Sequence, residues 1–160
     1  MSTPDHSYPA FSPYITVHNA AQAIAFYAAA FGTEERFRLV DESTGKIGHA
    51  ELTLHGSLLM LSDENPAWNK SPQTLGGTPV KFSLMVENAD AAIAKAVAAG
   101  ATPLMPAGDQ FYGFRSGSVR APFGHEWMLQ HEIEKVSPEE MQKRWSAMTG
   151  NCQSVKEEAK

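Results

Sequence analysis

Two stretches of the chain carry the same pattern of alternating apolar and polar residues followed by a helical repeat of apolar residues. The first spans residues 13–32 and the second spans residues 82–100. In both, a strand ends in Val, an Asn follows, and the helix stops at Gly. Asn accepts a hydrogen bond from a free amide of the first helical turn, and Gly adopts the left-handed conformation that ends helices. Chance similarity between Ala-rich helices would not match these residues as well, so the pattern indicates a repeated unit.

Each helix places apolar residues three and four positions apart, which is typical of a helix that buries one face. Small Ala residues on that face let a helix lie close against a sheet, so each unit is interpreted as a strand with a covering helix. The residues on the two stripes are Ala20, Ile24, Tyr27 and Phe31 in the first helix, and Ala89, Ile93 and Val97 in the second.

Three further alternating stretches follow each helix, separated by turn residues. The predicted strands of the first module are 11–17, 35–40, 46–54 and 57–62, and those of the second are 80–86, 102–105, 112–120 and 126–131, with a turn at 106–109. In the first strand, Phe11, Pro13, Ile15 and Val17 should lie beneath the helix. The predicted organisation is a module at 11–63, a linker loop at 64–78, a second module at 79–132, a helix at 137–149 and a disordered tail at 150–160.

Three residues at the start of the predicted C-terminal helix are typical of a helix N-terminus. Ser137 is suited to capping, Pro138 to the first helical position, and Glu140 to closing a capping box. Met141, Trp145 and Met148 then form an apolar stripe, which should pack on the body of the protein or on a partner subunit.

Composition excludes several classes of function. The chain has 160 residues, 42% of them hydrophobic, and a net charge of −5 without a basic cluster, which argues against nucleic-acid binding. No stretch is long and apolar enough to span a membrane. The single cysteine, Cys152, cannot form a disulfide within the chain and fits a reducing compartment, so we expect a cytoplasmic protein.

Two strand-helix-three-strand modules in a chain of this length resemble the vicinal oxygen chelate superfamily, which includes glyoxalase I, extradiol dioxygenases and bleomycin-resistance proteins. The runs HAEL at 49–52, FYGFRSGSVRAPFGHEW at 111–127 and VSPEEMQKR at 136–144 are similar to its PhnB-like branch. The resemblance implies an α+β fold in which two βαβββ modules form a curved eight-stranded mixed sheet around a small-molecule cavity, with a C-terminal helix and usually a homodimer.

Combined with the predicted strand faces, this fold implies a mixed apolar and polar cavity lining. His49 and Glu51 are the candidate catalytic pair, as base and orienting partner or as two displaced metal ligands. They could equally form a satisfied polar lining with Arg115 or Lys81, and those two cations suit an acidic ligand or ion pairs with Glu51 and Glu126. The predicted ligand-binding residues are Tyr14, His49, Glu51, Met60, Lys81, Ser83, Tyr112, Arg115, Glu126 and Met128.

Metal-dependent members of the superfamily carry His or Glu at positions that correspond here to Ser12, Met60, Lys81 and Met128. Ammonium and thioether groups do not suit a divalent metal site that needs imidazole and carboxylate donors, so no metal and no cofactor is predicted. Met60 and Met128, with Met85, could instead form an adaptable wall or ordinary core. The chain also departs from the family's usual acids at Phe114 and Ala121. His125 and Trp127 fall on the helix side of the last strand and are predicted to be packing residues.

Two functions remain open from the sequence. The first is a metal-independent small-molecule-binding protein of the glyoxalase and bleomycin-resistance type. The alternative is a lyase, isomerase, epimerase or dioxygenase-like enzyme that uses His49 and Glu51, with or without a divalent ion. The sequence identifies neither the ligand nor the pathway.

Overall fold

The structure is a computed structural model that describes residues 7–157, with side chains described for residues 7–150. Each half of the chain folds as strand, helix and three strands. The first module contains β1 (Tyr14–Val17), α1 (Ala20–Phe31), β2 (Glu34–Val40), β3 (Ile47–Leu54) and β4 (Ser57–Asp63). The second contains β5 (Lys81–Met85), α3 (Ala89–Ala98), β6 (Thr102–Asp109), β7 (Phe114–Arg120) and β8 (Glu126–Glu132). A short helix, α2 (Pro72–Leu75), lies between the modules, and α4 (Pro138–Glu157) follows them.

The eight strands form two four-stranded sheets with the same topology, β1-β4-β3-β2 in the first module and β5-β8-β7-β6 in the second. The first and last strands of each module pair in parallel, with Tyr14 opposite Met60 and Lys81 opposite Glu126. All other pairs are antiparallel. The predicted α+β class with two βαβββ modules is therefore confirmed, and hydrogen bonding divides the eight strands into two separate sheets.

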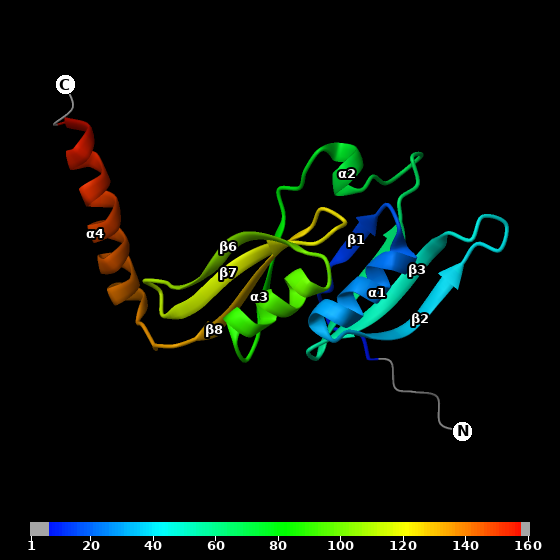
Figure 1. Ribbon diagram of the computed structural model, residues 1–160, viewed down its shortest axis with the longest axis horizontal. Coiled ribbons are helices and arrows are strands. Elements are labelled where there is room, and N and C mark those ends of the chain that lie inside the picture. The colour runs from blue at the N-terminus through cyan, green and yellow to red at the C-terminus, as the bar shows by residue number, and fades with distance from the viewer. Residues whose placement is uncertain (1–6, 158–160) are drawn as a thin grey trace.

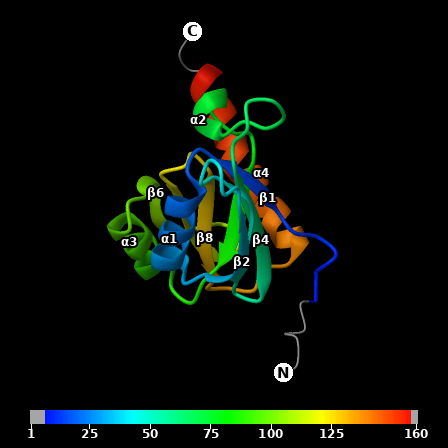
Figure 2. The same ribbon diagram turned by 90° about the vertical axis from the view of Figure 1, so that its right-hand side faces the viewer.

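Helices α1 and α3 begin directly after the Asn residues that were predicted to cap them. Asn19 Oδ1 accepts a hydrogen bond from the Gln22 amide at 3.0 Å, and Asn88 Oδ1 accepts one from Ala91 at 3.0 Å. Gly32 ends α1 in the left-handed conformation, with φ of 69°. The two helices lie next to each other and each covers one sheet, as Figure 1 and Figure 2 show from two directions.

An aromatic cluster joins the two modules. Tyr27 and Phe31 of α1 pack against Trp127 of β8, with ring centroids 5.5 and 5.0 Å apart, and Phe26 packs against Phe123 at 6.0 Å. Trp127 is 3% exposed, in agreement with its predicted packing role. Tyr27 is fully buried, and burial raises the pKa of its hydroxyl. Because both modules contribute rings to this cluster, it fixes how the sheets lie relative to each other.

Phe11 is not buried beneath α1 as predicted, because the strand begins only at Tyr14. Its side chain is 85% exposed, whereas Ile15 and Val17 are buried as expected. The alternating pattern continues through residues 11–13, but this segment leaves the sheet, so alternation alone overestimates the strand.

The predicted turn at 106–109 is also wrong, since β6 continues to Asp109 and the chain turns at Gln110–Gly113 instead. Register shifts on both sides of Met105 accommodate the irregular pairing with β7. Pro106 is tolerated because β6 is an edge strand, whose outer side needs no amide donor. Gly113, with φ of 89°, supplies the left-handed conformation that the turn needs.

Two helical segments differ from expectation. The linker predicted as a loop contains α2, with the Ser71 side chain as its N-cap. The C-terminal helix begins with Ser137 Oγ accepting from the Glu140 amide at 3.2 Å, as predicted. It then continues past Gly150 to Glu157, into residues predicted as tail. A single Gly costs a helix only about 1 kcal/mol relative to Ala, and no Pro follows to stop it; residues 158–160 lie outside the described residues.

Helix α4 projects away from both sheets in Figure 1. Its base is held by Arg144, which donates two hydrogen bonds to Glu134 at 2.9 Å, and by Trp145, whose ring lies 5.6 Å from that of Phe111. Trp145 and Met148 remain 50% and 56% exposed, so the predicted apolar stripe is largely uncovered in the single chain. Across residues 7–157 no helix combines the length and apolarity needed to cross a membrane.

Candidate functional site

Four polar side chains form a continuous row on the face of the first sheet that is turned away from α1. The Tyr14 hydroxyl lies 3.1 Å from His49 Nδ1, and His49 Nε2 lies 3.2 Å from Glu51 Oε1. Arg36 Nη1 lies 3.3 Å from Glu51 Oε2 at the other end. We call Tyr14, His49, Glu51 and Arg36 the polar row.

The sheet register brings three of these residues together. Met60 of β4 lies opposite both Tyr14 of β1 and Glu51 of β3, so the two side chains flank it on one face. The intervening Ala50 is completely buried on the α1 side, which directs His49 and Glu51 to the opposite face. The structure thus brings Tyr14, His49, Glu51 and Met60 together as the sequence predicted.

Glu51 is the buried member of the row. The residue is only 2% exposed, and the Arg36 side chain beside it is 11% exposed. A carboxylate so far from water is costly unless it is paired. Arg36 and His49 supply that pairing, while Glu51 Oε2 has no partner with hydrogen-bond geometry among the described residues. His49 therefore faces one carboxylate oxygen and Arg36 faces the other.

The row also fixes the state of His49. An ionised carboxylate only accepts hydrogen bonds, so the His49 Nε2 that faces Glu51 carries the proton. In the neutral ring with this tautomer Nδ1 is the acceptor, and the Tyr14 hydroxyl is placed to donate to it at 3.1 Å or to the Gly48 carbonyl at 3.4 Å. A ligand with an acidic O–H or N–H can donate to the same nitrogen, and Glu51 would stabilise the imidazolium formed if the proton moved.

Sequence reasoning missed Arg36 and Tyr8. Simple alternation puts Arg36 and Arg38 on one face, but a register shift between Glu35 and Phe37 separates them. Arg38 then pairs with Glu35, while Arg36 turns to Glu51. Such a bulge leaves no reliable signal in this sequence.

Tyr8 comes from the segment before β1 and lies against the same end of the row. The Arg36 guanidinium sits 5.1 Å from the centre of the Tyr8 ring. Partial desolvation and the neighbouring Glu51 carboxylate raise the pKa of the Tyr8 hydroxyl. Tyr8 thus helps to cover Glu51, although its position in the sequence lies outside any regular pattern.

The row runs between two hollows of the first module. At the Tyr14 end, a hollow of about 650 Å³ is bounded by Tyr14, Gly48, Ser62, Asn69 and Trp68. At the Arg36 end, a smaller hollow of about 350 Å³ lies beneath Ser7 and Pro9. The larger one has the volume of a typical small-ligand site, and its lining combines the Trp68 ring with hydroxyl, amide and charged groups, the last from Asp41, Lys46, Asp63 and Glu64.

The predicted residues of the second module share a face of the second sheet. Lys81 Nζ lies 3.5 Å and Arg120 Nη2 lies 2.8 Å from the Glu126 carboxylate. Arg120, with Lys81 adding to its effect, holds the pKa of Glu126 below its usual range. Ser83, which lies opposite Met128, accepts a hydrogen bond from Gln130 at 2.9 Å. The charged groups on this face of the second sheet, Lys81, Arg120 and Glu126, are thus paired with one another.

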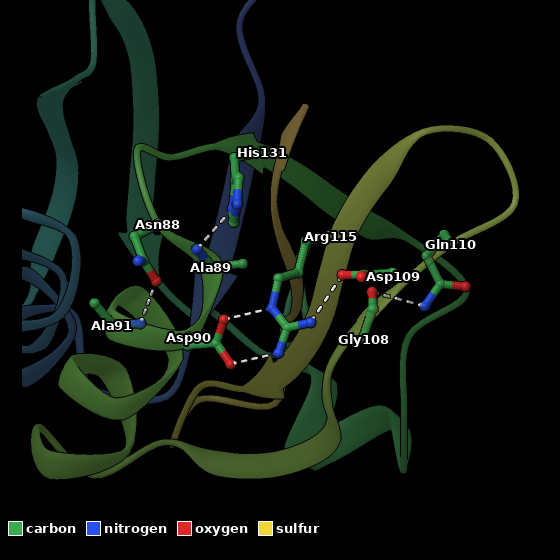
Figure 3. A network of polar contacts seen from close by, with 9 residues as sticks. All are labelled: Asn88, Ala89, Asp90, Ala91, Gly108, Asp109, Gln110, Arg115 and His131. Carbon is green, nitrogen blue, oxygen red and sulfur yellow. Dashed lines mark hydrogen bonds and ion pairs between the residues drawn. The ribbon is translucent and has the colours of Figure 1, made fainter. Parts of the chain in front are cut away.

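The face predicted for Arg115 is wrong, as Figure 3 shows. Arg115 points to the side covered by α3, where it donates to both Asp90 oxygens at 2.6 and 2.9 Å and to Asp109 at 2.8 Å. The same view shows His131 Nδ1 accepting from the Ala89 amide at 3.0 Å, which caps α3. The predicted face was one residue out of phase, because Arg115 shares the α3 side of β7 with Gly117, which faces Ile93 of α3.

Tyr112 also lies apart from the polar row. It belongs to the loop between β6 and β7, where its ring packs against Phe111 at 5.2 Å and Phe114 at 5.9 Å. Phe111 in turn contacts Trp145, so Tyr112 sits near the base of α4.

The side chains present do not fit a divalent metal. Within the described part of the chain, no three His, Cys, Asp or Glu residues are grouped as a metal site. His49 and Glu51 give two donors, but Arg36 already places a positive charge 3.3 Å from the carboxylate. Of the four positions that the family resemblance implied for metal ligands, Ser12, Met60, Lys81 and Met128, none carries an imidazole or a carboxylate, and Lys81 is paired with Glu126.

The chain belongs to the Glyoxalase/Bleomycin resistance protein/Dioxygenase superfamily, whose sequence profile matches residues 9–129. An uncharacterised protein of Mycobacterium bovis is 41% identical over 143 residues, covering 87% of this chain and 93% of the relative. An uncharacterised protein of Arabidopsis thaliana is 30% identical over 132 residues, covering 78% of this chain and 79% of the relative.

Solved structures share the fold. The X-ray structure of an Arabidopsis thaliana gene product, 30% identical, superposes with a TM-score of 0.63 and covers 77% of this chain and 98% of its own. TioX from Micromonospora sp. ML1 gives 0.62 at 24% identity, covering 79% and 99%. A PhnB protein from Bacillus cereus gives 0.59 at 19% identity, covering 77% and 99%. The last two show similarity of fold alone.

Replacing Arg36 with Met should destabilise the protein by about 3 kcal/mol, because the buried Glu51 loses its cation. Urea unfolding of Arg36→Met, Glu51→Gln and the double variant measures this. The double variant should recover most of the loss, since it no longer buries a carboxylate. Arg38→Met, on the exposed pair with Glu35, is the matched control and should change stability by less than about 1 kcal/mol. Equal effects of Arg36→Met and Arg38→Met would contradict the buried-charge interpretation.

Proposed function

We propose that the protein binds a small, planar, weakly acidic molecule at the Tyr14 end of the polar row, without a metal ion. The observation that carries this proposal is the His49 Nδ1 acceptor, held in place by Glu51 and directed to Tyr14 at 3.1 Å. An acidic O–H or N–H on a ligand can donate to that nitrogen in place of the tyrosine hydroxyl. The protein would act by sequestering its ligand or by passing on its presence to a partner.

The surroundings of the row support such a ligand. The adjacent hollow of about 650 Å³ offers the Trp68 ring as an apolar surface and Ser62 and Asn69 as hydrogen-bonding groups. The Arg36 guanidinium and the second acceptor oxygen of Glu51 lie at the far end of the row. A planar compound can therefore place its acidic group on His49 and its ring in the hollow.

A second candidate function is proton transfer, as in a lyase or isomerase. The specific observation in its favour is the order Tyr14, His49, Glu51, in which a carboxylate orients an imidazole whose free nitrogen faces a hydroxyl. In that case His49 accepts a proton from the bound substrate, and Glu51 stabilises the resulting imidazolium.

Ligand binding should depend on the residues of the polar row and not on imidazole or carboxylate groups elsewhere in the first module. A thermal-shift screen of hydroxyquinones and nitrophenols, followed by calorimetric titration of the best compound, provides the affinity. His49→Ala should weaken binding about tenfold, the value of roughly one hydrogen bond, whereas Tyr14→Phe removes the hydroxyl that competes for Nδ1 and should not weaken binding. His18→Ala and Glu34→Gln, on the same module outside the row, are controls that should bind normally.

The two candidate functions differ in the fate of the bound compound. A binding protein returns it unchanged, whereas a proton-transfer enzyme converts it and loses conversion in His49→Ala while the fold is retained. If His49→Ala binds the compound as tightly as the unchanged protein, the polar row is not the site.

We further propose a homodimer, in which a second copy covers the open faces of the two sheets. The polar row and the Lys81–Glu126 group lie on different sheets, and the groove of about 670 Å³ between the modules contains Lys81 and Ser83 but no residue of the row. The exposed Trp145 and Met148 of α4 add apolar surface for such contacts. Sedimentation velocity should give twice the chain mass of 17.4 kDa. A monomer at micromolar concentration would contradict the dimer.

A further inference from the structure

A second groove lies at the seam between the modules, and Tyr14 is the one residue of the polar row in its lining. It has a volume of about 450 Å³ and runs between β1 and the segment that leads into β5. Its apolar walls come from both modules and from the linker between them. The lining includes the apolar residues Phe11, Pro72, Leu75, Val80 and Phe82 and the polar residues Ser12 and His125.

The walls of this groove are held in place. Gln73 of α2 donates a hydrogen bond to the Pro122 carbonyl at 2.8 Å, which ties the linker helix to the second module. Gly124 lies so close to α2 that a Cβ there would approach Pro72 to 2.6 Å. Only glycine allows this approach, so close packing against Gly124 holds α2 in position as one wall of the groove.

Two buried polar groups in the lining have no partner. His125 is 6% exposed, and its Nδ1 makes no hydrogen bond with any described residue; the same is true of the buried Ser12 Oγ. Buried polar atoms are normally paired, and unpaired ones are costly. Burial also lowers the pKa of His125 to about 4, so the ring is neutral at physiological pH.

These features define the chemistry of a ligand. Apolar walls favour an aromatic ring, and the buried imidazole between them is neutral, while Lys70 is the cationic residue of the lining. A hydroxyl both donates and accepts, so it can pair with Nδ1 in either neutral tautomer of His125 and also with the Ser12 hydroxyl. We propose that the seam groove is a second binding site, which takes an aromatic alcohol of one or two rings whose hydroxyl pairs with His125 and Ser12.

The exposed side chains around the groove agree with an apolar occupant. Phe11, Leu75 and Val80 are 85%, 66% and 51% exposed, so three large apolar side chains border one groove. Phe11 also borders the neighbouring groove that contains Lys81, and its ring can turn over a bound aromatic compound from the rim. An aromatic ligand in the groove would bury apolar surface of Phe11, Leu75 and Val80 as well as its own.

The test uses 2-naphthol and naphthalene as probes, with binding to the full chain measured by equilibrium dialysis. The unchanged protein should bind 2-naphthol at least fivefold more tightly than naphthalene, through the hydroxyl. His125→Phe keeps an aromatic ring and should remove this preference, and Ser12→Ala should reduce it. Val80→Arg, at an exposed position, should block both probes. His18→Phe is the matched control and should behave as the unchanged protein.

Outcomes at the two sites can be separated. Glu51→Gln alters the polar row and should leave 2-naphthol binding unchanged; loss of binding in that variant alone would place the probe in the polar row and overturn the seam site. An absence of 2-naphthol binding, or an unaltered preference in both His125→Phe and Ser12→Ala, would also overturn it. Each variant's thermal midpoint shows that it is folded, and Ser12→Ala provides the answer if His125→Phe is not.

Discussion

The charge of Glu51 constrains the open face of the first sheet. A carboxylate that is 2% exposed needs partners, and the chain provides Arg36 from a bulge in β2 and His49 from two positions earlier in β3. That pairing favours the His49 tautomer protonated at Nε2, in which Nδ1 is an acceptor that faces the Tyr14 hydroxyl. The hydrogen bond from Tyr14, and any ligand that competes for it, depends on this one buried charge.

The two modules repeat the same architecture but use it differently. At the end of the fourth strand, Asp63 caps α1 through the Ala20 amide, and His131 caps α3 through Ala89 in the matching place. On the open faces, however, the second module neutralises its charges internally between Lys81, Arg120 and Glu126. In the first module His49 lies beside Tyr14, which borders the hollow of about 650 Å³, and for this reason the proposed ligand site belongs to it.

Most of the architecture was predictable because it depends on local signals. Asn caps, Gly stops and strand alternation located both modules and placed Tyr14, His49 and Glu51 on one face. Features set by tertiary contacts were not predictable. The bulge that turns Arg36 to Glu51, the return of Tyr8 over the sheet and the pairing of Arg115 with Asp90 all depend on segments distant in sequence. Alternation could not show them, since it assumes a regular strand with one fixed phase.

The most direct test of the account is the protonation state of His49, measured by long-range proton–nitrogen NMR of the imidazole rings at neutral pH. His49→Gln assigns the signal. We predict a neutral ring protonated at Nε2 with Nδ1 as acceptor, and an Nδ1 shift that changes in Tyr14→Phe. Loss of the Nε2–H preference in Glu51→Gln would confirm the source of the constraint. A ring protonated at Nδ1, or one that exchanges freely between tautomers in the unchanged protein, would contradict it.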